Sequence, residues 1–517
     1  MNMDKVCIRL EPLSVEVLVP RGAPLAPALA PLGIELPCGG TSRCGGCGVR
    51  VLAGSLPITS HDLAVFTAAE LADGWRLACQ ARAEMPLVLE SSQWRMAVLA
   101  DDSVQDGTGK SGLGIAIDLG TTTLAAQMVD LATGRILGVQ TDLNPQMSFG
   151  ADVMSRIQAA LSGDDLTTVV RLALRQMVEK LARGREPEIV EVVLVGNTVM
   201  HHLFSGLDVE PLSRTPFESP QLGVQCFTPQ DLDWPLPPAC RIRFERCLGG
   251  FVGSDILAGI LAAGISGAEN LMALVDLGTN GEIAIGNRHG IVCASTAAGP
   301  AFEGGSIRMG MRAATGAISH LWLSDGELHS TVIGNVEARG VCGSGLVDAV
   351  ACGLERGSIL SSGRIAIRSK SIPLTDSVSL FQSDIRELQL AKGAIASGFR
   401  LLLKNLGANS GNLHSIYLAG AFGNYVQPES AIGIGLIEAP MEIVHAAGNT
   451  ALRGAKMMLL AAGPLPLPRI NHISLAADPS FQDEYANCMT FPAKEEILSM
   501  PRWAPQAASG AMLQLAR

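Results

Sequence analysis

Two distant stretches of the chain repeat one pattern of strands and turns. The first begins at Gly114 and reads GIAIDLGTTTLAAQMVDLATGRIL; the second begins at Ala273 and reads ALVDLGTNGEIAIGNRHGIVCAST. Each stretch predicts a strand, a D-L-G-T turn and two further strands joined by a second turn. The repeat aligns Asp118 with Asp276, Gly120 with Gly278, and Thr121 with Thr279. A repeat on this scale indicates two lobes built on one plan, which constrains the fold of most of the chain.

The D-L-G-T turns have the chemistry of phosphate-binding loops. Glycine lets the backbone approach a phosphate closely, and the following N–H groups and threonine hydroxyls can donate hydrogen bonds to its oxygens. An aspartate at the end of the strand can hold Mg²⁺, directly or through water, or orient an attacking water. One such turn would be weak evidence, because Asp-x-Gly is common in hairpins. Two copies, each opening a three-stranded meander, favour phosphate binding.

A third motif, SIYLAGAFGNYV (415–426), predicts a strand that runs into a turn of small residues. Small residues there would let an adenine ring and a ribose lie against the backbone. A close crossing of a strand and a helix is the alternative, and the sequence leaves it open. Two further stretches rich in glycine and alanine, 249–264 and 340–354, predict helices in close contact, as at a hinge between lobes.

Four cysteines near the N-terminus predict an iron–sulfur site. Cys38, Cys44 and Cys47 form a C-x5-C-x2-C loop, and Cys79 follows. Three thiolates on one loop and a distant fourth are the usual ligands of a 2Fe–2S cluster, and the x5 spacing is similar to that of adrenodoxin-like ferredoxins. The flanking stretches alternate like strands of a small β-grasp domain. A structural zinc site is less favoured, because zinc ribbons usually carry two C-x2-C knuckles; free thiols are the third alternative.

The other cysteines and a histidine pair are expected to be structural. Six cysteines are too scattered for a second cluster, and we expect buried thiols at Cys226, Cys240, Cys247, Cys293, Cys342 and Cys352. His201 and His202 are expected at the start of a helix, with one ring packed and the other exposed.

Composition and charge exclude some classes of partner and indicate the cellular compartment. The 517 residues carry a net charge of −11, which argues against nucleic acid or an anionic membrane as a partner. No apolar run reaches the length of a spanning helix, and the N-terminus lacks the apolar core of a signal peptide. Twelve cysteines in a chain without an export signal are typical of thiols and metal ligands, so we expect a cytoplasmic protein.

Taken in order, the two D-L-G-T turns and the 415–426 loop resemble the nucleotide site of the actin, sugar-kinase and heat-shock-protein ATPase (ASKHA) superfamily, in which two ribonuclease-H-like lobes clamp ATP. Together with the N-terminal cluster loop, the arrangement resembles the reductive activators of corrinoid proteins. The resemblance extends from the cluster loop to about residue 492, and further family-like stretches are 144–157, 195–206, 295–318, 384–395 and 475–492.

This resemblance implies a multidomain α/β fold, in which an N-terminal β-grasp 2Fe–2S ferredoxin domain precedes two ribonuclease-H-like ASKHA lobes. The expected division is 1–95 for the ferredoxin-like domain, 96–112 for a linker, 113–265 for the middle region and first lobe, 266–492 for the C-terminal ATPase lobe, and 493–517 for a tail. Related activators of methylamine pathways carry C-terminal 4Fe–4S motifs. Only Cys488 lies in that region here, so a single cluster is expected.

The resemblance also implies a function: ATP-dependent reduction of an inactive Co(II) corrinoid to Co(I), with the electron passing through the 2Fe–2S cluster. Ferredoxin-level donors lie near about −400 mV. A deficit of one or two hundred millivolts corresponds to roughly 2–5 kcal/mol for one electron, which nucleotide-driven conformational change can offset. The implied partners are a corrinoid protein or corrinoid-dependent methyltransferase and an upstream low-potential donor, and a homodimer is expected from the family.

Residue roles follow from the same resemblance. The expected cluster ligands are Cys38, Cys44, Cys47 and Cys79. The expected phosphate-binding residues are Gly120, Thr121, Thr122, Thr123, Gly278, Thr279, Asn280 and Gly281, and Gly420, Ala421, Phe422, Gly423 and Asn424 are expected to contact adenosine. Asp118 and Asp276 are expected to handle Mg²⁺ and water. Asp276 is the first choice for positioning the attacking water, with Glu282 or Glu303 as alternatives.

Two other functions remain open on sequence grounds. The first is a plain electron-transfer protein whose ATPase-like part binds nucleotide without hydrolysing it. The second is a small-molecule kinase with an accessory cluster, because this superfamily hosts many chemistries.

Overall fold

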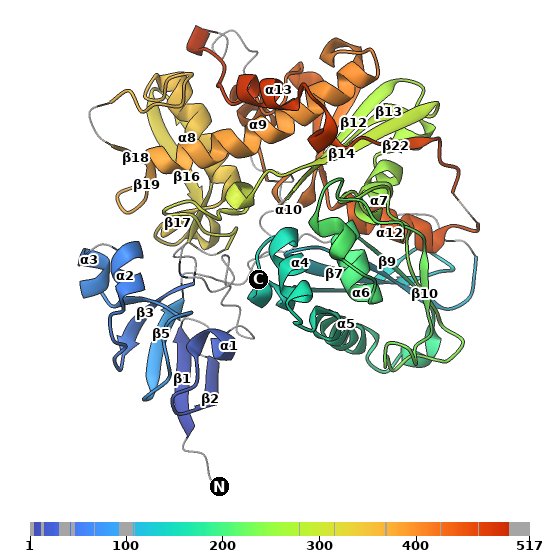
Figure 1. Cartoon of the computed structure of the whole chain (residues 1–517), viewed down its shortest axis with the longest axis horizontal. Coiled ribbons are helices and arrows are strands. Elements are labelled where there is room, and N and C mark those ends of the chain that lie inside the picture. Colours follow the sequence, from blue (N-terminus) through green and yellow to red (C-terminus); the bar gives the residue numbers. More distant parts are fainter. Residues whose placement is uncertain are drawn as a thin grey trace.

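The structure is a computed structural model that describes residues 5–11, 15–29, 42, 47–66, 68–91, 107, 109–278, 280–314, 316–367, 370–423, 425–463 and 465–495. Figure 1 shows a small N-terminal sheet beside a larger body, in which two extensive sheets are covered by helices. The predicted multidomain α/β fold is confirmed. Among the helices within the described ranges, none combines the length and the apolar character needed to cross a bilayer.

The N-terminal sheet has five strands in the order β2-β1-β5-β3-β4. Its strands are β1 (Lys5–Glu11), β2 (Val15–Pro20), β3 (Gly48–Ala53), β4 (Trp75–Leu77) and β5 (Leu87–Ser91), and its helices are α1 (Leu25–Leu29), α2 (Ser60–Val65) and α3 (Ala68–Ala72). β1 pairs antiparallel with β2 and parallel with β5. Alternate residues of β1, namely Val6, Ile8 and Leu10, are buried against α1 and β5. This mixed order is the β-grasp predicted from the alternation.

The first repeat builds a six-stranded sheet in the order β10-β11-β9-β6-β7-β8. The strands are β6 (Leu113–Leu119), β7 (Thr123–Asp130), β8 (Ile136–Leu143), β9 (Ile189–Gly196), β10 (Gln225–Phe227) and β11 (Arg241–Phe244). The helices are α4 (Val153–Leu161), α5 (Leu166–Ala182) and α6 (Thr198–Ser205). β6, β7 and β8 form the predicted antiparallel meander, while β9 pairs parallel with β6.

The second repeat builds a sheet of the same plan, in the order β21-β20-β12-β13-β14-β22. Its strands are β12 (Leu271–Leu277), β13 (Gly281–Asn287), β14 (Gly290–Thr296), β20 (Leu413–Ala419), β21 (Val444–Gly448) and β22 (Ile470–His472). Its helices are α8 (Gly343–Arg356), α9 (Gln382–Asn405), α10 (Gly420–Gly423), α11 (Pro428–Gly433) and α13 (Phe481–Cys488). Asp118 and Asp276 occupy equivalent registers, each opposite the end of a parallel strand. The predicted repeat is confirmed.

Smaller sheets extend the second lobe. β15 (Ala317–Ser324), β16 (Glu327–Val332) and β17 (Gly340–Val341) form a three-stranded sheet in the order β16-β15-β17. β18 (Ser371–Pro373) and β19 (Ser379–Phe381) pair as a hairpin. In Figure 1, β16 and β17 lie on the side of this lobe that faces the N-terminal sheet.

Helices α7 (Ser254–Ala262) and α12 (Thr450–Leu460) connect the cores of the two lobes. The two helix backbones are in direct contact at the crossing. A Cβ on Gly454 would lie 2.1 Å from the carbonyl oxygen of Ala258, so only glycine fits there. The close helix contact predicted for 249–264 is confirmed. The stretch 340–354 differs: in α8, a Cβ on Gly343 would lie 1.7 Å from the oxygen of Phe302, so this glycine fits α8 against a turn of its own lobe.

Two structural expectations are wrong in part. His201 and His202 are both fully buried, because His202 bonds Thr198 and Ser219 while His201 bonds the oxygen of Gly223. Cys226 is exposed on the short strand β10, whereas the other five cysteines expected to be buried are buried.

Candidate functional site

A cavity of about 180 Å³ lies between the two lobes, and both D-L-G-T turns line it. The predicted residues on its wall are Asp118, Gly120, Thr121, Thr122, Thr123, Asp276, Gly278, Asn280, Glu282, Glu303, Gly420 and Phe422. Thr279 and Asn424 lie outside the described residues. Gly281 belongs to β13, and Ala421 and Gly423 belong to α10; Gly281 and Gly423 do not line the cavity. The geometry therefore brings together residues that the sequence places far apart.

The first turn is held in shape by main-chain and asparagine contacts. The N–H of Gly120 donates to the oxygen of Thr123 at 3.0 Å, and a Cβ on Gly120 would lie 2.6 Å from that oxygen. Asn144 Nδ2 donates to the oxygen of Gly120 at 2.9 Å, and Asn197 Nδ2 donates to Thr121 Oγ1 at 2.7 Å. These asparagines were missed from the sequence, although each also caps a helix, at η2 (Pro145–Phe149) and at α6.

The second turn and α10 meet at Asp276. Gly420 has a φ of +85°, and a Cβ there would lie 2.4 Å from Asp276 Oδ1. Glycine is required at this position for two reasons, the left-handed backbone and the close approach of the carboxylate. The motif 415–426 thus places its small residues directly over the catalytic candidate.

Burial raises the pKa of four of the five carboxylates on the wall of the cavity. Burial raises the pKa of Asp118 to about 6, although Asn449 Nδ2 donates to its Oδ2 at 3.0 Å and lowers it. Burial, and then the charge of Asp118, raise the pKa of Asp276 to about 7. The pKa values of Asp255 and Glu282 also lie well above their usual range, first through burial and then through neighbouring carboxylates. Buried carboxylates this close together favour bound protons or cations, which relieve their mutual repulsion.

Asp255 is a site residue that the sequence reasoning missed. It lies in the first turn of α7, the helix that connects the lobes, and it lines the cavity. A signal was present, because Asp255 is the single charged residue of the small apolar stretch 249–264. Within the part of the chain that the structure describes, no three metal-binding side chains are arranged to hold an ion by themselves. Mg²⁺ is usually bound by one or two carboxylates plus phosphates and water, so the donor set fits a metal that arrives with nucleotide.

The ionisation of these carboxylates predicts a stability profile. A carboxylate whose folded-state pKa is raised stabilises the fold below its unfolded pKa, and this stability is lost as the pH rises through the folded pKa. Without nucleotide or divalent cations, the melting temperature should therefore decrease as the pH rises from about 4 to about 7.5. D276N should remove the part of this slope that Asp276 contributes, which is roughly 4 kcal/mol in the free energy of unfolding for a pKa raised from 3.8 to about 7. Differential scanning fluorimetry at a series of pH values measures it, and an unchanged slope in D276N would contradict the assignment.

One basic side chain faces these acids. Of the described residues on the cavity wall, Arg312 is the single cationic one, and five are carboxylates: Asp118, Asp255, Asp276, Glu282 and Glu303. Glu303 accepts a hydrogen bond from Thr122 Oγ1 at 3.2 Å. Arg156 lies fully buried behind it, and burial lowers its pKa to about 9 against the opposing charge of Glu303. Arg312 can therefore bind a phosphate oxygen at this wall; it lies in the family-like stretch 295–318 but was not singled out from the sequence.

The wall also has an aromatic part. Phe302 and Phe422 have ring centroids 4.7 Å apart and are tilted by 31°. Both rings line the cavity, as does Tyr425. The N-terminus of α8, at Gly343 and Ser344, contributes backbone N–H groups that can bind an anion. Apolar rings and anion-binding groups in one cavity suit a nucleotide.

The cluster cysteines are described in part. Cys38 and Cys44 lie outside the described residues. Cys47 is buried at the start of β3, and its carbonyl oxygen accepts from the N–H of Ala78, which brings Cys79 beside it. Ser42 Oγ lies 3.7 Å from Cys79 Sγ, and Gln80 Nε2 lies 3.9 Å from it. Two cysteines on hydrogen-bonded neighbouring segments, with polar groups at the Cys79 sulfur, fit cluster ligands, whose potential such contacts tune.

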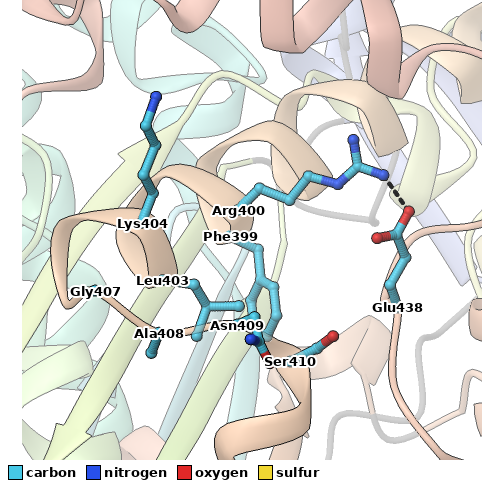
Figure 2. A pocket seen from close by; sticks show the side chains of 9 residues that line it. All are labelled: Phe399, Arg400, Leu403, Lys404, Gly407, Ala408, Asn409, Ser410 and Glu438. Carbon is cyan, nitrogen blue, oxygen red and sulfur yellow. Dashed lines mark hydrogen bonds and ion pairs between the residues drawn. The ribbon is translucent and has the colours of Figure 1, made fainter.

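A second hollow, of about 390 Å³, lies at the C-terminal end of α9, away from these residues. Figure 2 shows its apolar base, formed by Phe399, Leu403 and Ala408, and the Arg400 side chain reaching across to Glu438. Arg400 also pairs with Glu484 at 2.8 Å. Its arginine is already neutralised and none of the predicted residues lines it, so we assign the chemistry to the interlobe cavity.

Comparison with known proteins agrees along the whole chain. Three family models match: the 2Fe-2S iron–sulfur cluster binding domain at 8–84, the RACo middle region at 113–268, and the C-terminal domain of RACo, the ASKHA domain, at 270–501. The corrinoid activation enzyme RamQ of Eubacterium limosum is 36% identical over 415 residues, which are 72% of this chain and 69% of that relative.

Two more distant matches point the same way. The [Co(II) methylated amine-specific corrinoid protein] reductase of Methanosarcina barkeri is 26% identical over 67% of this chain and 70% of that relative. The solved structure of a reductive activator for corrinoid, iron–sulfur protein superposes with a TM-score of 0.64 at 25% identity, covering 94% of this chain and 98% of that one.

Proposed function

The chain belongs to the RACo-like family of corrinoid-activating enzymes, and on that premise we propose that it uses ATP to drive the reduction of a protein-bound corrinoid from Co(II) to Co(I). The observation that carries the proposal is the cavity in which both D-L-G-T turns, Asp276 and α8 converge, in the same chain as a 2Fe–2S domain. A ferredoxin-type domain alone would suffice for a favourable electron transfer. A nucleotide site is needed where the transfer is unfavourable.

The two half-processes balance separately. Overall, one electron from the upstream donor would convert Co(II) to Co(I), while ATP and water give ADP and phosphate. The cluster, when bound, supplies one-electron transfer at low potential. The chain's own part is to hold the four thiolates Cys38, Cys44, Cys47 and Cys79, and to position phosphates and water so that hydrolysis drives a conformational change.

The proposed roles in hydrolysis follow the geometry. Asp276 orients the attacking water, while Asp118, fixed by Asn449, would help to hold a Mg²⁺ that neutralises the phosphates. Thr121 to Thr123, Gly278 and Asn280 donate to phosphate oxygens, and Arg312 neutralises charge that develops on them. Phe302 and Phe422 contact the adenine ring. Glu282 and Glu303 remain the alternatives to Asp276 for holding the water.

The partner side of the proposal has three parts. The electron acceptor is a corrinoid protein or a corrinoid-dependent methyltransferase, and the donor to the cluster is an upstream low-potential carrier. We further propose that the protein is a homodimer and that it is cytoplasmic.

The proposed domains are 1–95, 113–265 and 266–492. A linker at 96–112 follows the first domain, and a tail at 493–517 follows the last.

One experiment tests the function. The protein is purified without oxygen, its cluster is reconstituted, and titanium(III) citrate is supplied as reductant. A panel of purified Co(II) corrinoid proteins, with free cob(II)alamin beside them, is then followed by absorbance. We expect Co(I) to form with ATP and the cluster present, and neither alone to suffice. Equal rates without ATP would favour an electron carrier with a nucleotide-binding scaffold, and rapid phosphorylation of a sugar or acid would favour a kinase.

Arg312 offers a sharper test of the hydrolytic site. R312Q removes the single cation that the described cavity wall presents to a phosphate, so kcat for ATP hydrolysis should fall about 10–100-fold. R312K should recover part of the loss, because it restores charge without the planar fork of donors. The matched control is R400Q at the second hollow, which should hydrolyse ATP at the wild-type rate. A wild-type rate in R312Q would exclude Arg312 from the site.

A further inference from the structure

Arg339 connects the N-terminal domain to the second lobe. Its Nη1 lies 3.1 Å from Oε1 of Glu90, which is on β5 of the N-terminal sheet. The same carboxylate pairs with Arg50 Nη2 at 2.7 Å, and Arg50 reaches Asp73 at 3.2 Å. The Glu90 side chain is only 16% exposed. A mostly covered carboxylate between two guanidiniums forms a more defined contact than an exposed surface pair.

Arg339 is close in the chain to the wall of the nucleotide cavity. It directly precedes β17, and after β17 come Cys342, Gly343 and Ser344, all of which line the cavity. Gly343 is the first residue of α8, the helix whose N-terminus faces the cavity. Only three residues, Gly340 to Cys342, separate the Arg339 backbone from the N-terminus of α8, which can bind phosphate.

A second segment, 309–316, runs beside 339–341 and is hydrogen-bonded to Arg339 at its end. Met311 N donates to the oxygen of Val341 at 3.0 Å, and Val341 N donates to the oxygen of Met309 at 2.9 Å. Farther along, Arg339 N donates to the oxygen of Gly316 at 2.9 Å. Between these contacts, Arg312 and Ala313 line the cavity.

The arginine side chain lies against this second segment. Gly316 has a φ of +92°, and a Cβ there would lie 3.1 Å from Arg339 Cδ. The Arg339 side chain is therefore held by two short segments, 340–344, which continues its own backbone, and 311–316, which is hydrogen-bonded to it. Each of these segments has another part that lines the cavity and would contact a bound nucleotide.

We propose that Arg339 is a positioning residue, through which nucleotide in the cavity changes how the N-terminal domain is held at Glu90. The proposal rests on the nucleotide site proposed above. A ligand shifts a conformational equilibrium only by its different contacts with the two states. Phosphates that draw in Arg312 and the N-terminus of α8 move the segments that carry Arg339, so the bound and free forms differ in the Arg339–Glu90 contact. The cluster domain is thereby repositioned for its partner when nucleotide is present.

Hydrogen exchange read by mass spectrometry tests this on the full, cluster-loaded chain, with and without Mg²⁺ and adenylyl imidodiphosphate. In the wild type, nucleotide should slow exchange in a peptide covering 118–124. It should also change exchange about two- to fivefold in a peptide containing Glu90, the range for one ion pair of this exposure. In R339Q the first effect should stay and the second should disappear.

The controls separate this inference from the function on which it rests. R185Q removes an ion pair whose arginine is about as exposed as Arg339, Arg185–Glu188 in the first lobe, and should respond like the wild type. E90Q removes the same contact together with the Arg50 pair, so it should also lose the nucleotide effect near residue 90, and the double variant should lose no more of that effect than R339Q does.

Each contrary result has a distinct meaning. A nucleotide effect near Glu90 that persists in R339Q, or is absent from the wild type despite protection at 118–124, would overturn the role of Arg339 alone. Absence of protection at 118–124 in the wild type would overturn the nucleotide site and this inference with it. Corrinoid reduction should fall about two- to fivefold in R339Q while ATP hydrolysis without partner is unchanged, and equal loss of both would also count against a positioning role.

Discussion

D276N is expected to reduce ATP hydrolysis by about 10²–10⁴-fold and to abolish sustained Co(I) formation, while the absorbance of the iron–sulfur cluster stays unchanged. Asp276 ends β12 on the cavity wall, with the backbone of α10 against its Oδ1. Asparagine fills the same space, so the loss would report the charge and the proton-accepting oxygen rather than a collapsed cavity. The two readouts are phosphate release and absorbance of the corrinoid.

The matched control is D164N, which changes an exposed aspartate in the turn between α4 and α5. It should leave both rates at the wild-type value. Hydrolysis by D276N near the wild-type rate would move the water-positioning role to another carboxylate. E282Q and E303Q would then be compared in the same assay, since both side chains line the cavity.

C79S should remove the cluster and lower corrinoid reduction at least about 10³-fold, because a 2Fe–2S centre depends on all four thiolates and no second electron carrier is expected in the chain. Cys79 is half-buried beside Cys47, with the Ser42 and Gln80 side chains at its sulfur. ATP hydrolysis without partner should persist, since the described wall of the nucleotide cavity takes no residue from the N-terminal domain. Visible absorbance, iron content and electron paramagnetic resonance of the reduced protein measure the loss.

C226S serves as the control for C79S, because Cys226 is an exposed thiol on β10, far along the chain from the cluster loop. It should retain iron, colour and activity. A C79S protein with a normal 2Fe–2S spectrum would show that another group supplies the fourth ligand. A colourless wild type after reconstitution would contradict the cluster itself.

The parts of the fold that the sequence predicts are those encoded by local patterns. The D-L-G-T turns fix where strands end, and the order of strands and turns around each of them predicts the meanders β6 to β8 and β12 to β14. From two copies of one meander, the two equivalent sheets follow. The small residues of 249–264 likewise predict a close helix crossing, although its partner α12 carries no comparable signal.

The residues that were missed reach the site through long-range contacts. Asp255, Arg312 and Asn449 come from three separate elements, and only the closing of the two lobes brings them to one cavity. No local pattern distinguishes Asn449 from any other helix cap, yet its amide bonds Asp118. The exposed ring expected in the histidine pair was wrong for the same reason, since Ser219 and Gly223 cover His202 and His201 from a later loop.

The equivalence of the two sheets has an electrostatic consequence. Each repeat carries an aspartate near the end of its first strand. Asp118 and Asp276 therefore place two negative charges on opposite sides of the cavity between the lobes. Above neutral pH their repulsion opposes any approach of the lobes until a cation and phosphates separate them. In the proposed function, loss of those groups after hydrolysis would leave the same repulsion between the lobes and would favour their separation.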